Sequence, residues 1–221
     1  MLYGIIADIH SNLEAFEVVL QQLRQVDQIV CAGDMVGYGP DPNQCIKLMR
    51  EKGIRSIAGN HDKAAVGEMN LEWFNENARR AVEWTSEQLT GDSAQYLKLL
   101  PLTLEMDDFQ IVHGSLRNPL EEYIFTLAEA AATMELMSKP LCFVGHTHRP
   151  ARFEYQGKAI INPGGAGQPR DGDPRASFGI YDSEKKEFIL HRVEYNIERV
   201  QEKMRQADLP QSLIDRLQYG R

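Results

Sequence analysis

The sequence has few cysteines, no long hydrophobic run and no basic tract. Its 221 residues include only Cys31, Cys45 and Cys142, which are widely spaced and odd in number. A disulfide framework or a cysteine metal site is therefore not expected. This cysteine usage predicts a reducing, cytoplasmic setting.

The apolar stretches are short, and the charge is acidic. The first stretch, LYGIIAD at residues 2–8, has no charged region before it and is too short for a signal peptide or a membrane span. The net charge is −8 without a run of Lys or Arg, so we expect no membrane association and no stable nucleic-acid binding. The composition predicts one globular domain over residues 1–221, and a homodimer is compatible although no motif supports it.

Short apolar runs alternate with helix-like segments along the chain. Several runs are apolar throughout, as in strands that are covered on both faces. The early strand–helix alternation predicts a layered α/β fold, and the short link DSEKKE predicts antiparallel pairing of the last two strands. We expect strands to begin near Tyr3, Gln28, Ile54, Phe109, Leu141, Ala159, Ser177 and Glu187, and helices over residues 12–24, 41–52, 71–89, 127–137, 196–207 and 210–218.

Polar side chains follow most of these strands at the point where each strand ends. They are Asp8 and His10, Asp34, Asn60 with His61 and Asp62, His113, and His146 with His148. Ligands of open α/β sheets bind beyond the carboxyl ends of the strands, so these side chains are predicted to converge. His191 lies inside a predicted strand and is expected to be an ordinary structural histidine.

The types of donor indicate a class of metal. Asp, Asn and His supply oxygen and nitrogen without thiolate, which suits Mn²⁺, Fe, Zn²⁺ or Ni²⁺ better than a soft metal or a calcium cage. Seven candidate ligands are too many for one ion, whereas two ions that share a carboxylate would use them all. They are Asp8, His10, Asp34, Asn60, His113, His146 and His148.

These residues occur in five blocks whose order resembles the calcineurin-like metallophosphoesterase family. The blocks read DIH at 8–10, GD at 33–34, GNHD at 59–62, His113, and GHTH at 145–148. The segment NPGGAGQPRDGDPRASFGIYD at 162–182 is further similar to a bacterial branch related to diadenosine tetraphosphatases and protein phosphatase-like phosphoesterases.

The resemblance implies a sandwich of two packed mixed β-sheets flanked by helices. It implies two divalent metal ions, with Mn²⁺ favoured: Asp8, His10 and His148 hold one, Asn60, His113 and His146 hold the other, and Asp34 bridges both. The implied activity is hydrolysis of phosphodiester or phosphomonoester bonds in small or nucleotide-like substrates by a metal-bridging hydroxide. In the same picture, His61 assists the leaving group and Asp62 orients its imidazole and raises its pKa.

Residues beside the motifs are candidates for binding the substrate. Tyr38 either stacks on a nucleobase or caps its loop. Arg170 and Arg175 either bind phosphate or form salt bridges with nearby aspartates, and Arg149 has comparable alternatives.

The segment 71–89 separates Asp62 from His113 and has the pattern of a packed helix. Its apolar residues Trp73, Phe74, Ala81 and Trp84 predict a core face or a lid over the site.

Two other functions are compatible with the motifs. A Ser/Thr protein phosphatase would use the same ligands, although no phosphate-binding arginines stand beside the early blocks. A non-catalytic scaffold with this fold would be expected to have lost ligands, and here the set is complete.

Overall fold

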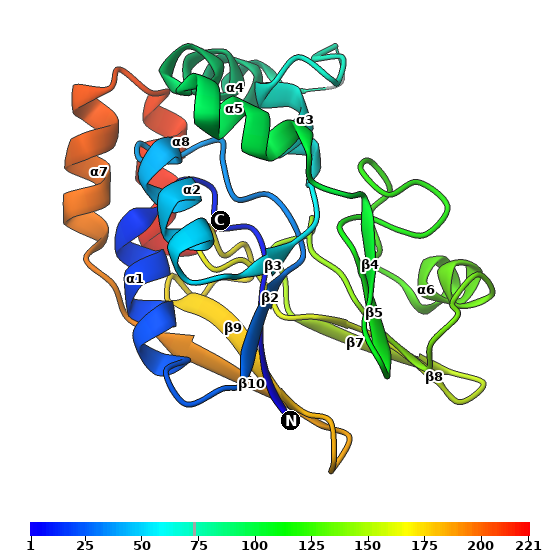
Figure 1. Cartoon of the computed structure of the whole chain (residues 1–221). Coiled ribbons are helices and arrows are strands. Elements are labelled where there is room, and N and C mark those ends of the chain that lie inside the picture. Colours follow the sequence, from blue (N-terminus) through cyan, green and yellow to red (C-terminus); the bar gives the residue numbers. More distant parts are fainter. Residues whose placement is uncertain (73) are drawn as a thin grey trace.

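The computed structural model describes residues 1–72 and 74–221, in which two five-stranded mixed sheets pack against each other (Figure 1). The first sheet has the order β10-β9-β1-β2-β3. Its strands β1, β2 and β3 run parallel, while β9 is antiparallel to β1 and β10 to β9. Their bounds are Leu2–Ile6 (β1), Gln28–Cys31 (β2), Arg55–Ser56 (β3), Ala176–Asp182 (β9) and Glu187–Val193 (β10).

The second sheet has the order β4-β5-β6-β8-β7. Its central strands β5, β6 and β8 are parallel, and the edge strands β4 and β7 pair antiparallel. The bounds are Thr103–Glu105 (β4), Phe109–Val112 (β5), Leu141–Phe143 (β6), Ala151–Tyr155 (β7) and Lys158–Asn162 (β8).

Helices cover the outer faces of both sheets, with α1, α2, α7 and α8 beside the first sheet and α6 beyond the second (Figure 1). Asn12 caps α1 as predicted, because its side chain accepts a hydrogen bond from the Ala15 main-chain N–H. The bounds are Leu13–Gln22 (α1), Pro42–Glu51 (α2), Asn60–Ala65 (α3), Glu76–Gln88 (α4), Gly91–Lys98 (α5), Leu127–Met134 (α6), Ile197–Gln206 (α7), Gln211–Arg216 (α8) and the 3₁₀ turn Leu217–Tyr219 (η1).

The core between the sheets is built from inward-facing side chains of both. Ile5 and Val30 of the first sheet and Phe109 and Phe143 of the second are fully buried in one cluster. The Phe109 and Phe143 rings meet edge to face with centroids 5.2 Å apart, a favourable aromatic geometry. This packing fixes the two sheets relative to each other and therefore aligns the loops at their ends.

The two-sheet sandwich and the antiparallel pairing of the last two strands are confirmed. The segment predicted as a helix from residue 71 forms α4 only from Glu76, and Trp73 lies outside the described residues. Four elements were not predicted: β4, β7, α3 and α5. Among the described helices, none combines the length and apolarity needed to cross a bilayer.

Candidate metal centre

The predicted ligands do converge, because they follow parallel strands that end at the same edge of the sandwich. Asp8 and Asp34 follow β1 and β2, Asn60 follows β3, and His113 and His146 follow β5 and β6. All seven candidate ligands are at most 7% exposed.

The backbone at these residues is strained. Asp8, His10, Asp34, His146 and His148 all have positive φ, between 49° and 68°. Non-glycine residues rarely adopt this region, and the conformation persists only where the surroundings impose it. Such a concentration of strained residues is typical of a functional site.

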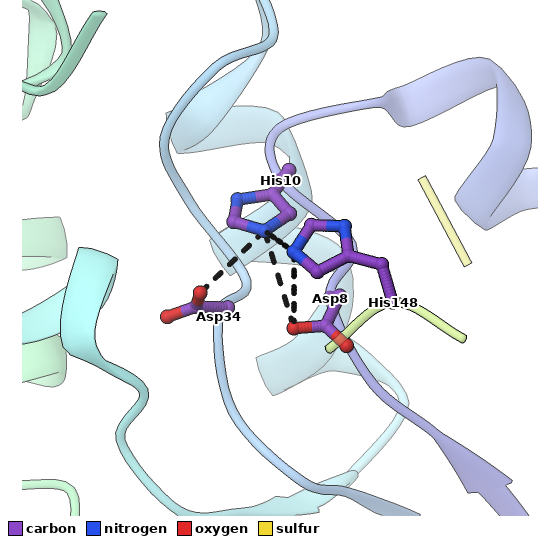
Figure 2. A group of neighbouring side chains, drawn as sticks. All are labelled: Asp8, His10, Asp34 and His148. Atoms are coloured by element: carbon purple, nitrogen blue, oxygen red, sulfur yellow. Dashed lines mark hydrogen bonds and ion pairs between the residues drawn. The ribbon is translucent and has the colours of Figure 1, made fainter. Parts of the chain in front are cut away.

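Four of the side chains form a first cluster (Figure 2). The Nε2 atoms of His10 and His148 lie 3.1 Å apart. His10 Nε2 lies 3.5 Å from Asp34 Oδ2, and His148 Nε2 lies 3.6 Å from Asp8 Oδ1.

A second cluster shares Asp34 with the first and adds Asn60, His113 and His146. His113 Nε2 lies 3.4 Å from Asp34 Oδ2 and 3.1 Å from Asn60 Oδ1. The same Asp34 oxygen thus faces a histidine of each cluster, while its Oδ1 accepts a hydrogen bond from the His61 main-chain N–H.

The hydrogen bonds of His10 and His148 leave two hydrogen-bond acceptors, their Nε2 atoms, facing each other. His10 Nδ1 is 3.0 Å from the Val36 carbonyl and His148 Nδ1 is 2.6 Å from the Gln168 carbonyl, so each Nδ1 must carry a hydrogen. In neutral rings, the facing Nε2 atoms then both present lone pairs. Burial lowers the pKa of both rings well below the usual value and keeps them neutral. A shared cation removes the repulsion, so the residues fit a metal ion here.

The second cluster shows the same need for positive charge. Burial opposes a charge on His113, but the Asp34 carboxylate outweighs it and raises the pKa of His113 to about 9. A proton on Nε2 then occupies the direction in which a metal ion would bind. Within the described part of the chain, Asp8 Oδ2, Asp34 Oδ2 and His146 Nε2 are buried atoms without a hydrogen-bond partner.

Close approach at Gly59 joins the two clusters to the loop after β3. A Cβ atom there would lie 2.0 Å from Asp34 Oδ1, so only glycine fits. The glycine therefore lets the start of α3 reach the shared carboxylate.

The expectation that Asp62 orients the His61 imidazole is wrong. The Asp62 carboxylate accepts hydrogen bonds from the main-chain N–H groups of Met35, Val36 and Gly59 instead. His61 and Asp62 are consecutive residues of α3, and consecutive side chains of a helix point in different directions. Asp62 therefore holds the loop after Asp34, and burial lowers the pKa of His61 to about 4 rather than raising it.

A cavity of about 130 Å³ opens beside the second cluster. His61 borders it, and within the described chain its buried Nδ1 has no partner. Phe74, just before α4, and Ala78 are among the residues that line the cavity. Ala81 is buried and Trp84 packs beside it in a cluster with α7 and α8, as the core-face interpretation of this segment predicted. The lining residues are Tyr38, Asn60, His61, Met69, Phe74, Asn75, Ala78, Glu121, Tyr123 and His146.

Tyr38 does not offer a free face to a nucleobase, as one interpretation of the sequence required. Tyr38 is only 6% exposed, and its ring centroid lies 4.7 Å from that of His10 and 4.3 Å from that of His61. The guanidinium of Arg216 covers the ring at 4.7 Å from its centre.

The three arginines named from the sequence have different surroundings. Arg175 forms the predicted alternative, a salt bridge with Asp173. Arg149 is exposed, and its Nε donates a hydrogen bond to the Arg170 carbonyl. Arg170 lies near the first cluster with its guanidinium 5.5 Å from the centre of Tyr38.

Sequence reasoning missed three residues that lie at or beside this centre. Tyr123 stacks on His146 with ring centroids 3.8 Å apart, and Gln168 accepts a hydrogen bond from His148. Arg216 reaches Tyr38 from α8, far along the chain. None of them belongs to a motif with metal-ligand spacing, so only the fold identifies them.

With this geometry in place, the comparisons with known proteins define the family. The model of the calcineurin-like phosphoesterase superfamily domain matches residues 1–186, and the chain belongs to this superfamily. The family binds divalent metals, and both side-chain clusters described above are suited to do so.

Two similar proteins match over the whole chain, and a third matches over part of it. An uncharacterized protein of Methanocaldococcus jannaschii is 35% identical, covering 100% of this chain and 98% of its own length. The crystal structure of a metallophosphoesterase from Sphaerobacter thermophilus has 42% identity and a TM-score of 0.92, covering 100% of this chain and 99% of that one. The serine/threonine-protein phosphatase 1 of Salmonella typhimurium is 32% identical over 68 residues, 28% of this chain and 30% of that protein.

Proposed function

We propose that this chain is a dinuclear metal-dependent phosphoesterase that hydrolyses phosphomonoester or phosphodiester bonds of small or nucleotide-like substrates. The observation that carries the proposal is the 3.1 Å approach of two imidazole Nε2 atoms whose Nδ1 hydrogens are both used by carbonyl oxygens. This arrangement is stable only with a positive charge between the rings.

Asp8, His10 and His148 would hold one ion, and Asn60, His113 and His146 would hold the other, with Asp34 shared. When bound, two such ions would polarise the phosphoryl oxygens and supply a hydroxide nucleophile near neutral pH. The chain has every residue that these two metal sites would need.

His61 would assist the leaving group from the wall of the cavity. His61 lines the cavity, where its imidazole would donate a hydrogen bond to a phosphoryl or leaving oxygen. Burial keeps the ring neutral in the free protein. The negative charge of an adjacent phosphate would raise its pKa toward neutrality. Asp62 supports this chemistry by holding the loop after Asp34 through main-chain hydrogen bonds.

The small cavity favours a small phosphate ester as substrate over the extended surface of a phosphoprotein. A Ser/Thr protein phosphatase is the second candidate, supported by the local similarity to the Salmonella phosphatase. Phosphopeptides compared with p-nitrophenyl phosphate distinguish the two, because the small cavity, which Phe74 and Ala78 help to line, is expected to slow the reaction of the peptide.

We further propose that the chain acts as one domain, with Mn²⁺ as the favoured ion, in a cytoplasmic setting. The oxygen- and nitrogen-rich ligand set supports Mn²⁺, and three buried free cysteines support a reducing compartment. The net charge of −8 argues against stable nucleic-acid binding.

Hydrolysis by metal-stripped protein tests the proposed function. Mn²⁺, Zn²⁺, Ni²⁺, Fe²⁺ or Mg²⁺ is added in turn, with p-nitrophenyl phosphate and bis-p-nitrophenyl phosphate offered in parallel. We expect about two equivalents of a transition metal to restore hydrolysis. Stoichiometric metal binding without hydrolysis of either ester or a phosphopeptide would favour a non-catalytic scaffold.

His191→Gln is the matched control for the ligand histidines. His191 lies in β10 and stacks on Phe178 at 5.3 Å, away from both clusters. This variant is expected to retain wild-type metal content and hydrolysis.

A further inference from the structure

Two arginines from distant parts of the chain meet over Tyr38. Arg170 belongs to the loop after β8, and Arg216 ends α8. Their guanidinium carbons lie 5.5 Å and 4.7 Å from the centre of the Tyr38 ring. The same ring also contacts His10 and His61, so both positive charges lie one side chain away from the candidate metal centre.

Gln168 holds the two guanidinium groups together. Its Oε1 accepts hydrogen bonds from Nη2 of Arg170, at 2.8 Å, and from Nη2 of Arg216. The carbonyl of the same residue accepts the hydrogen bond from His148 Nδ1. One residue thus places two like charges beside a candidate metal ligand.

The nearby aspartates do not neutralise this pair. Asp171 forms a salt bridge with Arg192, and Asp173 forms one with Arg175. Over the described ranges, neither Arg170 nor Arg216 forms a salt bridge, and the buried Nε of each has no acceptor.

Such an arrangement is unfavourable on its own. Burial and the charge of Arg170 lower the pKa of Arg216 to about 10. Buried donors without acceptors and two like charges on one neutral oxygen both cost free energy. An anion that accepts from both guanidinium groups would remove both costs.

We propose that Arg170 and Arg216 form an anion subsite beside the metal centre, which binds a dianionic phosphate or the second phosphoryl group of a pyrophosphate-type ligand. Two guanidinium groups favour a phosphomonoester dianion over a phosphodiester monoanion, because the attraction scales with charge. The selectivity for substrates depends on the proposed function, whereas anion binding does not. The family match over residues 1–186 does not include Arg216.

Binding of methylenediphosphonate, a pyrophosphate analogue with a non-hydrolysable bridge, to metal-free protein tests the subsite directly. Isothermal titration calorimetry is expected to show binding that Arg216→Met or Arg170→Met weakens by about 10–100-fold, the loss expected for hydrogen bonds between charged groups. Arg216→Lys keeps the charge without the planar guanidinium, and its affinity for the analogue should lie between those of wild type and Arg216→Met. Arg205→Met on α7 is the matched control, because Arg205 is an exposed partner of Glu202.

Hydrolysis gives the second readout, with metal content measured in parallel. Arg216→Met is expected to lower kcat/KM for p-nitrophenyl phosphate more than for bis-p-nitrophenyl phosphate, with unchanged metal content. Unchanged analogue affinity in folded Arg216→Met and Arg170→Met would overturn the subsite. If Arg216→Met does not fold, unchanged affinity in both Arg170→Met and Arg216→Lys would overturn it equally.

The two proposals fail in different ways. If the wild-type protein binds the analogue but hydrolyses no ester with any metal, the proposed function fails and the subsite stands. If it hydrolyses esters while the arginine variants bind the analogue like wild type, the subsite fails and the function stands.

Discussion

The two halves of the candidate centre use similar ligands but differ in access. The closed half, Asp8, His10 and His148, is at most 2% exposed, and none of it borders the cavity beside His61. In the open half, which comprises Asn60, His113 and His146, two members border that cavity. Substrate would therefore enter over the open half, and an ion in the closed half would exchange more slowly.

The difference has a physical origin in what holds each histidine. Main-chain carbonyls of Val36 and Gln168 fix the rings of the closed half. In the open half, the Ala32 carbonyl fixes His113 in the same way, but His146 stacks on Tyr123, a residue that is 44% exposed. One of the two histidines of the open half is thus supported by a side chain that a ligand could move.

Removing the shared carboxylate is expected to have the largest effect, because both halves of the centre use it. Asp34→Asn removes the charge that faces both His10 and His113. We expect loss of both ions and of all hydrolysis, measured by metal analysis and p-nitrophenyl phosphate turnover. Retention of two ions would show that Asp34 is not shared.

The next largest effect is a loss of turnover without a loss of metal, and it concerns His61 beside the open half. His61→Ala should lower kcat by about 10²–10⁴-fold, the usual contribution of a positioned acid–base group. Metal content should stay at the wild-type level, because His61 is assigned no ion. A variant that loses metal but keeps its activity per bound ion would instead make His61 a ligand.

A smaller effect should separate the halves directly. Tyr123→Ala removes the stacking partner of His146 and should weaken the ion of the open half by about 10–100-fold, as changes around metal ligands do. Tyr123→Phe keeps the ring and should behave like wild type. Equal weakening of both ions in Tyr123→Ala would contradict the division into halves.

The smallest effect is a pH dependence of the metal-free protein. The folded pKa of His113, about 9, exceeds its ordinary value of 6.5, so the folded state binds more protons between these values. Its stability should fall as pH rises from 7.5 to 9, by at most about 1.4 kcal/mol per pH unit.

Each kcal/mol should lower Tm by about 2–4 °C in a chain of this size. Thermal unfolding of wild type and of His113→Asn, which lacks the group, measures the contribution. Identical slopes in the two proteins would contradict the assignment of this proton to His113.

The apolar runs predicted a layered α/β fold and the strand-end motifs predicted the ligand convergence, because both are strong local signals. The two-sheet sandwich followed from the family resemblance that those motifs carry. It did not predict β7, an edge strand whose half-exposed residues form no continuous apolar run. It also missed α3, a helix of only six residues that begins at Asn60.

The errors at the site came from the direction of side chains rather than from the choice of residues. The family resemblance implied that Asp62 orients the His61 ring, but the helical backbone of α3 turns the two side chains apart. Arg216 could not be found from sequence, because its approach to Tyr38 depends on how α8 packs.

Metal binding to stripped protein tests the central claim most directly. Titration with Mn²⁺, followed by electron paramagnetic resonance, counts the bound ions and detects coupling between them. We predict two ions per chain, with the closed half filled first and spin coupling when the second ion binds. A single ion, or two uncoupled ions, would contradict a dinuclear centre built around Asp34.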